Sequence, residues 1–273
     1  MIILALAIPS VSCLQKNAIT VFAGSVSKIA IEETALLFEE QTGIKVYLNS
    51  GGSGALLSQM KLSHSGDLYI PGSPDYMTTA GQDGVIIPES VHAISYLIPA
   101  ILVPHNNPKN IETLTDLAKP EIKIGIANPE SVSIGLYAYE ILEYNDLLSD
   151  VGKNIVTYGD SYAKTFGLLA FGSVDAIIGW DIFAKWNRDT TDIIYLKPEQ
   201  LPRISYISVA LSTFSQNPEN ARKFLDFLVS SKGQEIFHEW EYITTESEAR
   251  IFTPEAKIGG EYHLPASYEP LVN

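Results

Sequence analysis

The sequence predicts an α/β protein of two lobes, each a mainly parallel β-sheet flanked by helices, with a ligand cleft between the lobes. Strand and helix patterns alternate through the first quarter of the chain and again through its middle, and this alternation is typical of parallel sheets covered by helices. Extended segments near residues 88–98 and 198–208 are expected to connect the two halves. The 273 residues are enough for two lobes of roughly 100 to 150 residues each.

The first half reads as three strand and helix pairs. The expected strands are "AITVFA", "IKVYLN" and "DLYIPG". The helices that follow them are expected at residues 27–41, 54–62 and 75–80. In the first of these helices, Ile31, Ala35 and Phe38 recur at helical spacing and form one apolar face.

The second half repeats this pattern after an extended, β-branched segment, "AISYLIPAILVP". The expected strands are "IKIGIAN", "NIVTYG", "VDAIIGW" and "PRISYISVAL", and the expected helices are 111–118, 134–144, 162–171 and one that begins after Asn217. Pro218 suits the first position of that last helix. We therefore expect lobe I to comprise residues 18–92 and 204–273, and lobe II residues 93–203.

Residues 1–17 are expected to be an export signal or a lipoprotein leader. "MIILALAIPSVSC" is shorter than the about 20 apolar residues that span a bilayer but has the length of the apolar region of a signal, although the usual preceding positive segment is missing. Cys13 resembles the acylated cysteine of lipoproteins, although Ser10 stands where Leu or Val is usual. The alternative is a buried first strand. The expected location is periplasmic or extracytoplasmic, and lipid anchoring through Cys13 stays open.

Charge and composition narrow the possible partners. The net charge of −14, without a basic cluster, argues against nucleic acid and anionic membrane surfaces. A single cysteine allows no internal disulfide, and the five histidines show no HxxxH or similar spacing. We therefore expect no nucleic-acid partner, no cofactor and no residues that bind a metal cation directly.

Small polar residues stand at four predicted junctions between a strand and a helix. "AGSVS" contains Ser25 and Ser27, "GGSG" contains Ser53, and "PESVSIG" and "GDSYAK" precede the helices near Ile134 and Tyr162. A helix N-terminus offers unpaired N–H groups and a partial positive charge, which together suit an anion. The alternative is that these serines are ordinary helix caps. Their recurrence in both halves favours an anion site, and the residue pattern alone leaves both interpretations open.

Several stretches of the sequence also resemble a known protein family. "ITVFAGSVSKIAIEETALLFEEQTGIKVYLNSGGSGALLSQM", followed by "GDLYIPGSPDYM", resembles the opening of the periplasmic molybdate- and tungstate-binding proteins of ABC importers, which are type II periplasmic binding proteins. "IGIANPESVSIGLYAYEIL" and "GSVDAIIGWDIFA" are similar to later regions of that family. The likeness covers roughly residues 18–240. It implies a two-lobed receptor that delivers its ligand to a membrane permease driven by an ATPase, and we expect a monomer.

The resemblance also implies a set of oxyanion ligands. They fall on Ser25 or the adjacent Val26, Ser53, the backbone N–H of Ile134, the backbone near Tyr162, and Trp180. Trp180 departs from the family, which commonly has a tyrosine hydroxyl at that position. An indole N–H donates a hydrogen bond but cannot accept one.

Donors alone suit a fully deprotonated dianion, whereas protonated phosphate also needs an acceptor. We therefore rank molybdate or tungstate above sulfate, and sulfate above phosphate. Asp160, Glu130 and Asp181 lie near the junctions, so a carboxylate in the site stays open. The alternative of an α/β enzyme acting on a phosphorylated or carboxylated small molecule lacks a nucleophile motif or an acid and base pair. We expect a binding protein without catalytic residues.

Overall fold

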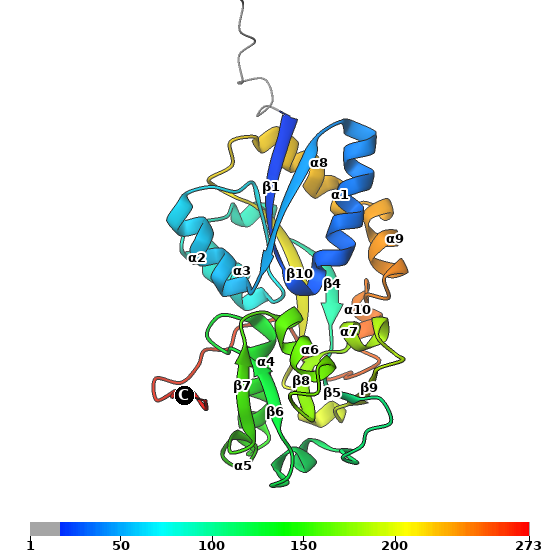
Figure 1. Ribbon diagram of the computed structural model, residues 1–273. Coiled ribbons are helices and arrows are strands. Elements are labelled where there is room, and N and C mark those ends of the chain that lie inside the picture. Colours follow the sequence, from blue (N-terminus) through cyan, green and yellow to red (C-terminus); the bar gives the residue numbers. More distant parts are fainter. Residues whose placement is uncertain (1–16, 273) are drawn as a thin grey trace, which may run out of the picture.

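The computed structural model describes residues 17–272 and contains two mixed β-sheets with helices packed on them (Figure 1). This arrangement confirms the predicted α/β class. We call the first sheet with its helices lobe I, and the second sheet with its helices lobe II. The predicted leader, including Cys13, lies outside the described residues except for Asn17.

The first sheet has the strand order β11-β10-β3-β1-β2, and β4 pairs with β10. Its strands are β1 (Ala18–Gly24), β2 (Lys45–Gly51), β3 (Leu68–Ile70), β4 (His92–Leu97), β10 (Arg203–Leu211) and β11 (Lys257–Ile258). β1 runs parallel to β2 and β3, whereas β10 runs antiparallel to β3 and β4. β3 is buried along its whole length, as expected for a parallel strand covered on both faces.

The second sheet has the strand order β7-β6-β8-β5-β9. Its strands are β5 (Pro99–Pro104), β6 (Ile124–Ala127), β7 (Ile155–Gly159), β8 (Ala176–Trp180) and β9 (Thr191–Tyr195). β6 runs parallel to β7 and β8, and β5 runs antiparallel to β8 and β9. The parallel strands therefore come from the predicted alternation, and the antiparallel ones lie next to the connections between lobes.

The helices cover both sheets. The α-helices are α1 (Lys28–Thr42), α2 (Ser53–Ser63), α3 (Pro74–Gln82), α4 (Ser133–Tyr144), α5 (Leu148–Gly152), α6 (Tyr162–Ala170), α7 (Asp181–Trp186), α8 (Pro218–Val229), α9 (Ser231–Glu239) and α10 (Glu246–Ala249). The 3-10 helices are η3 (Ser25–Ser27), η4 (Pro88–Ser90), η5 (Leu114–Ala118) and η6 (Pro198–Gln200). Within residues 17–272, no helix combines the length and apolar character that crossing a bilayer requires.

One predicted helix is shorter and tighter than expected. The segment 111–118 forms only the 3-10 helix η5, from Leu114 to Ala118. A capping box starts it, because the Asp116 carboxylate accepts from the backbone N–H of Thr113 at 2.9 Å. The same carboxylate also accepts from the N–H of Glu112, so it fixes a local turn that does not extend into an α-helix.

The chain crosses between the sheets through neighbouring strands. β4 ends at Leu97 and β5 begins at Pro99, and the chain returns through η6 into β10. β4 and β10 lie side by side and antiparallel, with Leu97 opposite Ser205. Two adjacent connections of this kind permit the lobes to rotate about a common axis.

The core of lobe I depends on the contact between α1 and α8. Phe38 of α1 is only 1 % exposed, and its ring lies 5.0 Å from that of Phe224 in an edge-to-face arrangement. Phe227 lies 5.6 Å away on the same helix as Phe224. Aromatic pairs of this geometry add to the free energy gained from burial.

We expect Phe38→Ala to lower the free energy of unfolding by about 3 to 5 kcal/mol, because it leaves a cavity between α1 and α8. Urea denaturation followed by circular dichroism measures this loss. Leu36→Ala on the same helix is the control, since Leu36 is 68 % exposed and its removal should change stability by less than about 0.5 kcal/mol. Equal losses for the two variants would contradict the proposed core contact.

Candidate functional site

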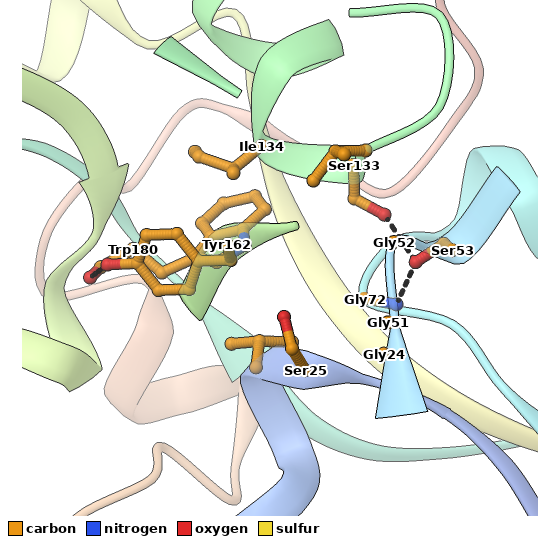
Figure 2. Close-up of a pocket in the computed structure, with 12 residues that line it drawn as sticks. Gly24, Ser25, Gly51, Gly52, Ser53, Gly72, Ser133, Ile134, Tyr162 and Trp180 are labelled. Carbon is orange, nitrogen blue, oxygen red and sulfur yellow. Dashed lines mark hydrogen bonds between the residues drawn. The ribbon is translucent and has the colours of Figure 1, made fainter. Parts of the chain in front are cut away.

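One pocket brings together residues from the ends of strands in both lobes (Figure 2). Its lining is formed by Gly24, Ser25, Val26, Gly51, Gly52, Ser53, Gly72, Val132, Ser133, Ile134, Tyr162 and Trp180. All six residues predicted from the sequence are among them. The structure therefore places residues more than 150 positions apart in the chain around one small space.

The lobe I side of the pocket is built from two tight junctions. β1 ends at Gly24 and leads into Ser25, and β2 ends at Gly51 and leads through Gly52 into α2. Gly52 approaches lobe II so closely that a Cβ there would lie 2.7 Å from the carbonyl oxygen of Asp160. Glycine is therefore required where the lobes meet.

Ser53 is held as a hydrogen-bond donor toward the pocket. Its side chain is buried, and Oγ accepts from the backbone N–H of Gly72 at 3.1 Å and from the Ser133 hydroxyl at 3.0 Å (Figure 2). A serine oxygen has two lone pairs, and these two bonds occupy both. The Ser53 hydroxyl hydrogen is then left to donate to a ligand.

Ser25 makes a second contact between the lobes. Its Oγ lies 3.4 Å from the backbone N–H of Ala163, in the first turn of α6, and Figure 2 shows its hydroxyl turned toward the centre of the pocket. Val26 also lines the pocket, and its backbone carbonyl accepts from the Tyr242 hydroxyl. Of these two adjacent residues, Ser25 supplies the polar side chain.

The helices α2, α4 and α6 all begin at the pocket, with Ser53, Ser133 and Tyr162 as their first residues. The N–H groups of a first helical turn have no acceptor inside their helix, and the helix dipole makes this end positive. Ile134, in the first turn of α4, is completely buried. Three such ends facing one space form an electrostatic environment that favours an anion.

Helix capping accounts for only part of the serine pattern. The Ser161 side chain caps α6 by accepting from the N–H of Lys164 at 3.3 Å. Ser53 is instead the first residue of α2, and the preceding Gly52 makes no side-chain cap. Ser27 precedes α1, but its hydroxyl donates to the carbonyl oxygen of Gly24. The pocket serines therefore are not explained by capping alone.

Tyr162 and Trp180 form the aromatic wall of the pocket. Both side chains are almost fully buried, and the Tyr162 hydroxyl donates to the backbone carbonyl of Trp180. Burial, followed by the nearby Asp181 carboxylate, raises the pKa of Tyr162 well above its ordinary value, so the phenol stays neutral. The ring of Tyr137 packs edge-on against Trp180 at 5.1 Å.

Three carboxylates near the junctions, those of Asp160, Glu130 and Asp181, were considered as possible parts of the site. None of them lines the pocket. Asp160 forms an exposed ion pair with Lys164 at 2.6 Å, and Glu130 is exposed. Asp181 is buried but pairs with Lys185 at 2.7 Å and accepts from the Tyr195 hydroxyl at 3.1 Å. All twelve lining residues are uncharged, so the pocket offers polar donors and apolar walls.

The pocket is small in this closed arrangement. The space in which the centre of a water-sized sphere can move is about 10 Å³. A cavity of this size holds about one water molecule. A tetrahedral oxyanion is larger and would fit only if the lobes separated slightly along the contacts described above. Elsewhere in residues 17–272, no group of three or more His, Cys, Asp or Glu side chains is arranged to hold a metal ion.

Two residues that contribute polar groups to the pocket, Ser133 and Gly72, were not predicted from the sequence. Ser133 lies inside the "PESVSIG" segment already identified as a junction, so its sequence position contained the relevant signal. Gly72 follows β3, and only the fold brings its N–H to Ser53. A glycine after a short buried strand has no feature that distinguishes it in the sequence.

The fold is that of the two-lobed type II periplasmic binding proteins, as predicted. The chain belongs to the family described as bacterial extracellular solute-binding proteins, whose model matches residues 19–242. A sequence relative is the putative ABC transporter substrate-binding lipoprotein YvgL of Bacillus subtilis. It is 24% identical over 227 residues, which cover 83% of this chain and 86% of the relative.

Solved structures with similar folds are named for different ligands, among them sulfate, molybdate and thiamin. The sulfate-binding protein SubI of Mycobacterium tuberculosis aligns with a TM-score of 0.76 and 15% identity, covering 89% of this chain and 94% of its own. The periplasmic molybdate-binding protein of Azotobacter vinelandii aligns with a TM-score of 0.71 and 18% identity, covering 84% of this chain and 100% of its own. At this level of sequence identity the likeness establishes the fold but not the ligand, which has to be inferred from the chemistry of the pocket.

Gly54→Ala is expected to prevent full closure of the lobes while leaving each lobe folded. The N–H of Gly54 donates to the carbonyl oxygen of Ser131 in lobe II at 2.9 Å. An added Cβ would lie 3.0 Å from Cα of Ser131 and 2.8 Å from the Tyr76 ring. Small-angle X-ray scattering without ligand should show a larger radius of gyration than for the unmodified protein.

The matched control is Gly81→Ala, in helix α3 of the same lobe. A Cβ at Gly81 meets only the side chain of Ile86, at 3.7 Å, which is an ordinary contact. This variant should scatter like the unmodified protein. A compact Gly54→Ala variant would show that the contact between Gly54 and Ser131 does not limit closure.

Proposed function

We propose that this protein captures a tetrahedral oxyanion outside the cytoplasm, with molybdate or tungstate as the first choice, and delivers it to the permease of an ABC importer. The observation that carries this proposal is the uncharged pocket in which helix N-termini and serine hydroxyls from both lobes converge. Membership of a solute-binding family supports capture rather than catalysis.

The hydrogen bonds of the pocket favour a fully deprotonated anion. Ser53 has both lone pairs engaged, so it acts toward the ligand as a donor. The backbone N–H groups of Ile134 in α4 and Tyr162 in α6, and the indole of Trp180, also only donate. An anion that accepts at every oxygen is matched by this set, whereas an anion with an O–H group needs an acceptor.

The candidate anions differ in whether they carry a proton, and this difference ranks them. Molybdate, tungstate and sulfate are tetrahedral dianions without a proton, and the similar folds include proteins described as binding molybdate and sulfate. Sulfate is therefore the second candidate. Phosphate ranks below both, because Asp181 is engaged by Lys185 and the other two neighbouring carboxylates lie outside the pocket.

Delivery to a transporter follows from the proposed class. YvgL is described as an ABC transporter substrate-binding lipoprotein, which supports a permease and its ATPase as partners of this chain. We extend this to a monomer that is held at the membrane surface by a lipid on Cys13. Closing of the lobes around the anion is the signal that such a permease would read.

Isothermal titration calorimetry with molybdate, tungstate, sulfate and phosphate tests the ligand. We expect molybdate or tungstate to bind most tightly, sulfate more weakly and phosphate least. A thermal-shift assay provides an independent measure, because a ligand that binds only the folded state raises stability with the logarithm of its excess. The absence of binding to all four anions would overturn the proposal.

Ser53→Ala is expected to weaken binding of the preferred anion by roughly 10- to 100-fold, the effect of one lost hydrogen bond to a charged group. The fold should be preserved, since Ser53 is not the cap of α2. The control is Ser63→Ala at the other end of the same helix, where the exposed hydroxyl is hydrogen-bonded to the carbonyl oxygen of Gln59 and to the Ser65 hydroxyl, away from the pocket. Calorimetry that gives both variants the same affinity would exclude Ser53 as a ligand.

A further inference from the structure

Arg203 lies at the start of the crossing strand β10 and is 3 % exposed. Its guanidinium forms ion pairs with Asp75 at 2.9 Å and with Glu140 at 2.6 Å. It also donates to the backbone carbonyl of Gly260 at 2.8 Å. Arg203 does not line the anion pocket, so this cluster requires an explanation other than ligand contact.

The two carboxylates belong to different lobes. Asp75 stands in the first turn of α3 in lobe I, and Glu140 lies in α4, which packs on the sheet of lobe II. α4 is also the helix that begins at the pocket with Ser133. The bond between Arg203 and Glu140 therefore spans the connection between the lobes, and opening the lobes would separate a buried ion pair.

The C-terminal segment makes a second connection on the same side. We call residues 257–272 the strap. It starts as β11, paired with β10, and the N–H of Tyr262 donates to Asp75 at 2.9 Å while the Tyr262 hydroxyl donates to Glu143 of α4 at 2.6 Å.

The end of the strap is anchored on lobe II. The N–H of Leu271 donates to the Tyr158 hydroxyl at 2.8 Å, and the Leu271 side chain packs against the core of lobe II. Figure 1 shows the strap in red, running from the level of the crossing strands to its end beside β7. It therefore holds both lobes at once.

A chain of ring contacts links this cluster to the pocket wall. The Arg203 guanidinium carbon lies 4.0 Å from the centre of the Tyr137 ring, a distance typical of a cation–π contact. Tyr137, also on α4, packs edge-on against Trp180, which lines the pocket. A movement of Arg203 relative to α4 thus alters the packing of the wall.

We propose that Arg203 is a positioning residue that, together with the strap, holds lobe II closed against lobe I and thereby determines how long a captured anion stays bound. The statement about the anion rests on the proposed function, whereas the statement about closure does not. When only a closed form binds tightly, the apparent dissociation constant rises as the closed fraction falls. Weakening the clamp should therefore accelerate release.

Two variants weaken the clamp without placing a new charge in the core. Glu140→Gln keeps the size of the side chain and removes the ionic part of the bond between lobes. Truncation after the exposed Glu261 removes residues 262–273 but keeps β11 and the peptide carbonyl of Gly260 that Arg203 binds. Arg203 itself is left unchanged, because its removal would leave Asp75 and Glu140 buried without a partner.

Single-molecule fluorescence energy transfer reports the separation of the lobes in the ligand-free full-length chain. Dyes are attached through Leu62→Cys in lobe I and Phe171→Cys in lobe II, which are 85% and 89% exposed, in a Cys13→Ser background. Both variants should populate a more open state than the unmodified protein. Stopped-flow release of molybdate should be at least about tenfold faster, with association within about threefold of the unmodified rate.

The control is Asp83→Asn, which removes the exposed pair with Lys61 at 2.7 Å inside lobe I and should change neither distance nor release. Unchanged distances in both clamp variants would overturn the proposal. More open lobes with accelerated release support it in full. More open lobes in a protein that binds none of the four oxyanions would support the clamp and reject the proposed function.

Discussion

The structure depends on a constraint set by the first turns of α2, α4 and α6. The first residues of these turns, Ser53, Ser133 and Tyr162, are buried where the lobes meet, and N–H groups at the start of a helix have no acceptor within that helix. A buried donor without a partner costs about 1 to 3 kcal/mol. The lobes partly satisfy each other, since Ser131 accepts from Gly54 and Ser25 accepts from Ala163. Under the proposed function, an anion between the lobes would satisfy several such donors at once, and closure and binding would become a single event.

Closure also depends on contacts between the lobes that lie away from the pocket. The crossing strands β4 and β10 permit rotation, while Arg203 and the strap connect the lobes on one flank. An ion pair buried in a protein gains little over well-packed apolar residues, but separating its partners is expensive. The bond from Arg203 to Glu140 is therefore better suited to resisting opening than to adding overall stability. Contacts at the pocket and contacts on the flank favour the same closed state.

The sequence predicted those features that depend on local chemistry. Alternating strand and helix patterns predicted the α/β class. "GGSG" before a predicted helix made Ser53 a candidate for either a helix cap or an anion ligand, and the family resemblance favoured the ligand. The features that it did not predict depend on contacts between distant segments. Ser133 donates to Ser53, which lies 80 positions earlier in the chain. Strand β9 forms by pairing with β5. The strap shows no hydrophobic periodicity, because it forms almost no regular secondary structure. The helix expected at 111–118 was reduced by the turn that Asp116 fixes.

The aromatic wall shows how selectivity can arise from the direction of hydrogen bonds. Tyr162 directs its hydroxyl to the Trp180 backbone, and burial keeps that phenol neutral, so the hydroxyl is engaged inside the protein. Trp180 also lines the pocket, and its indole N–H can only donate. Because Ser53 is also fixed as a donor, a protonated oxyanion entering this pocket would bury an O–H group facing other donors, a mismatch that costs more than a missing contact. A pocket of uncharged walls can in this way distinguish anions of the same shape by their protonation.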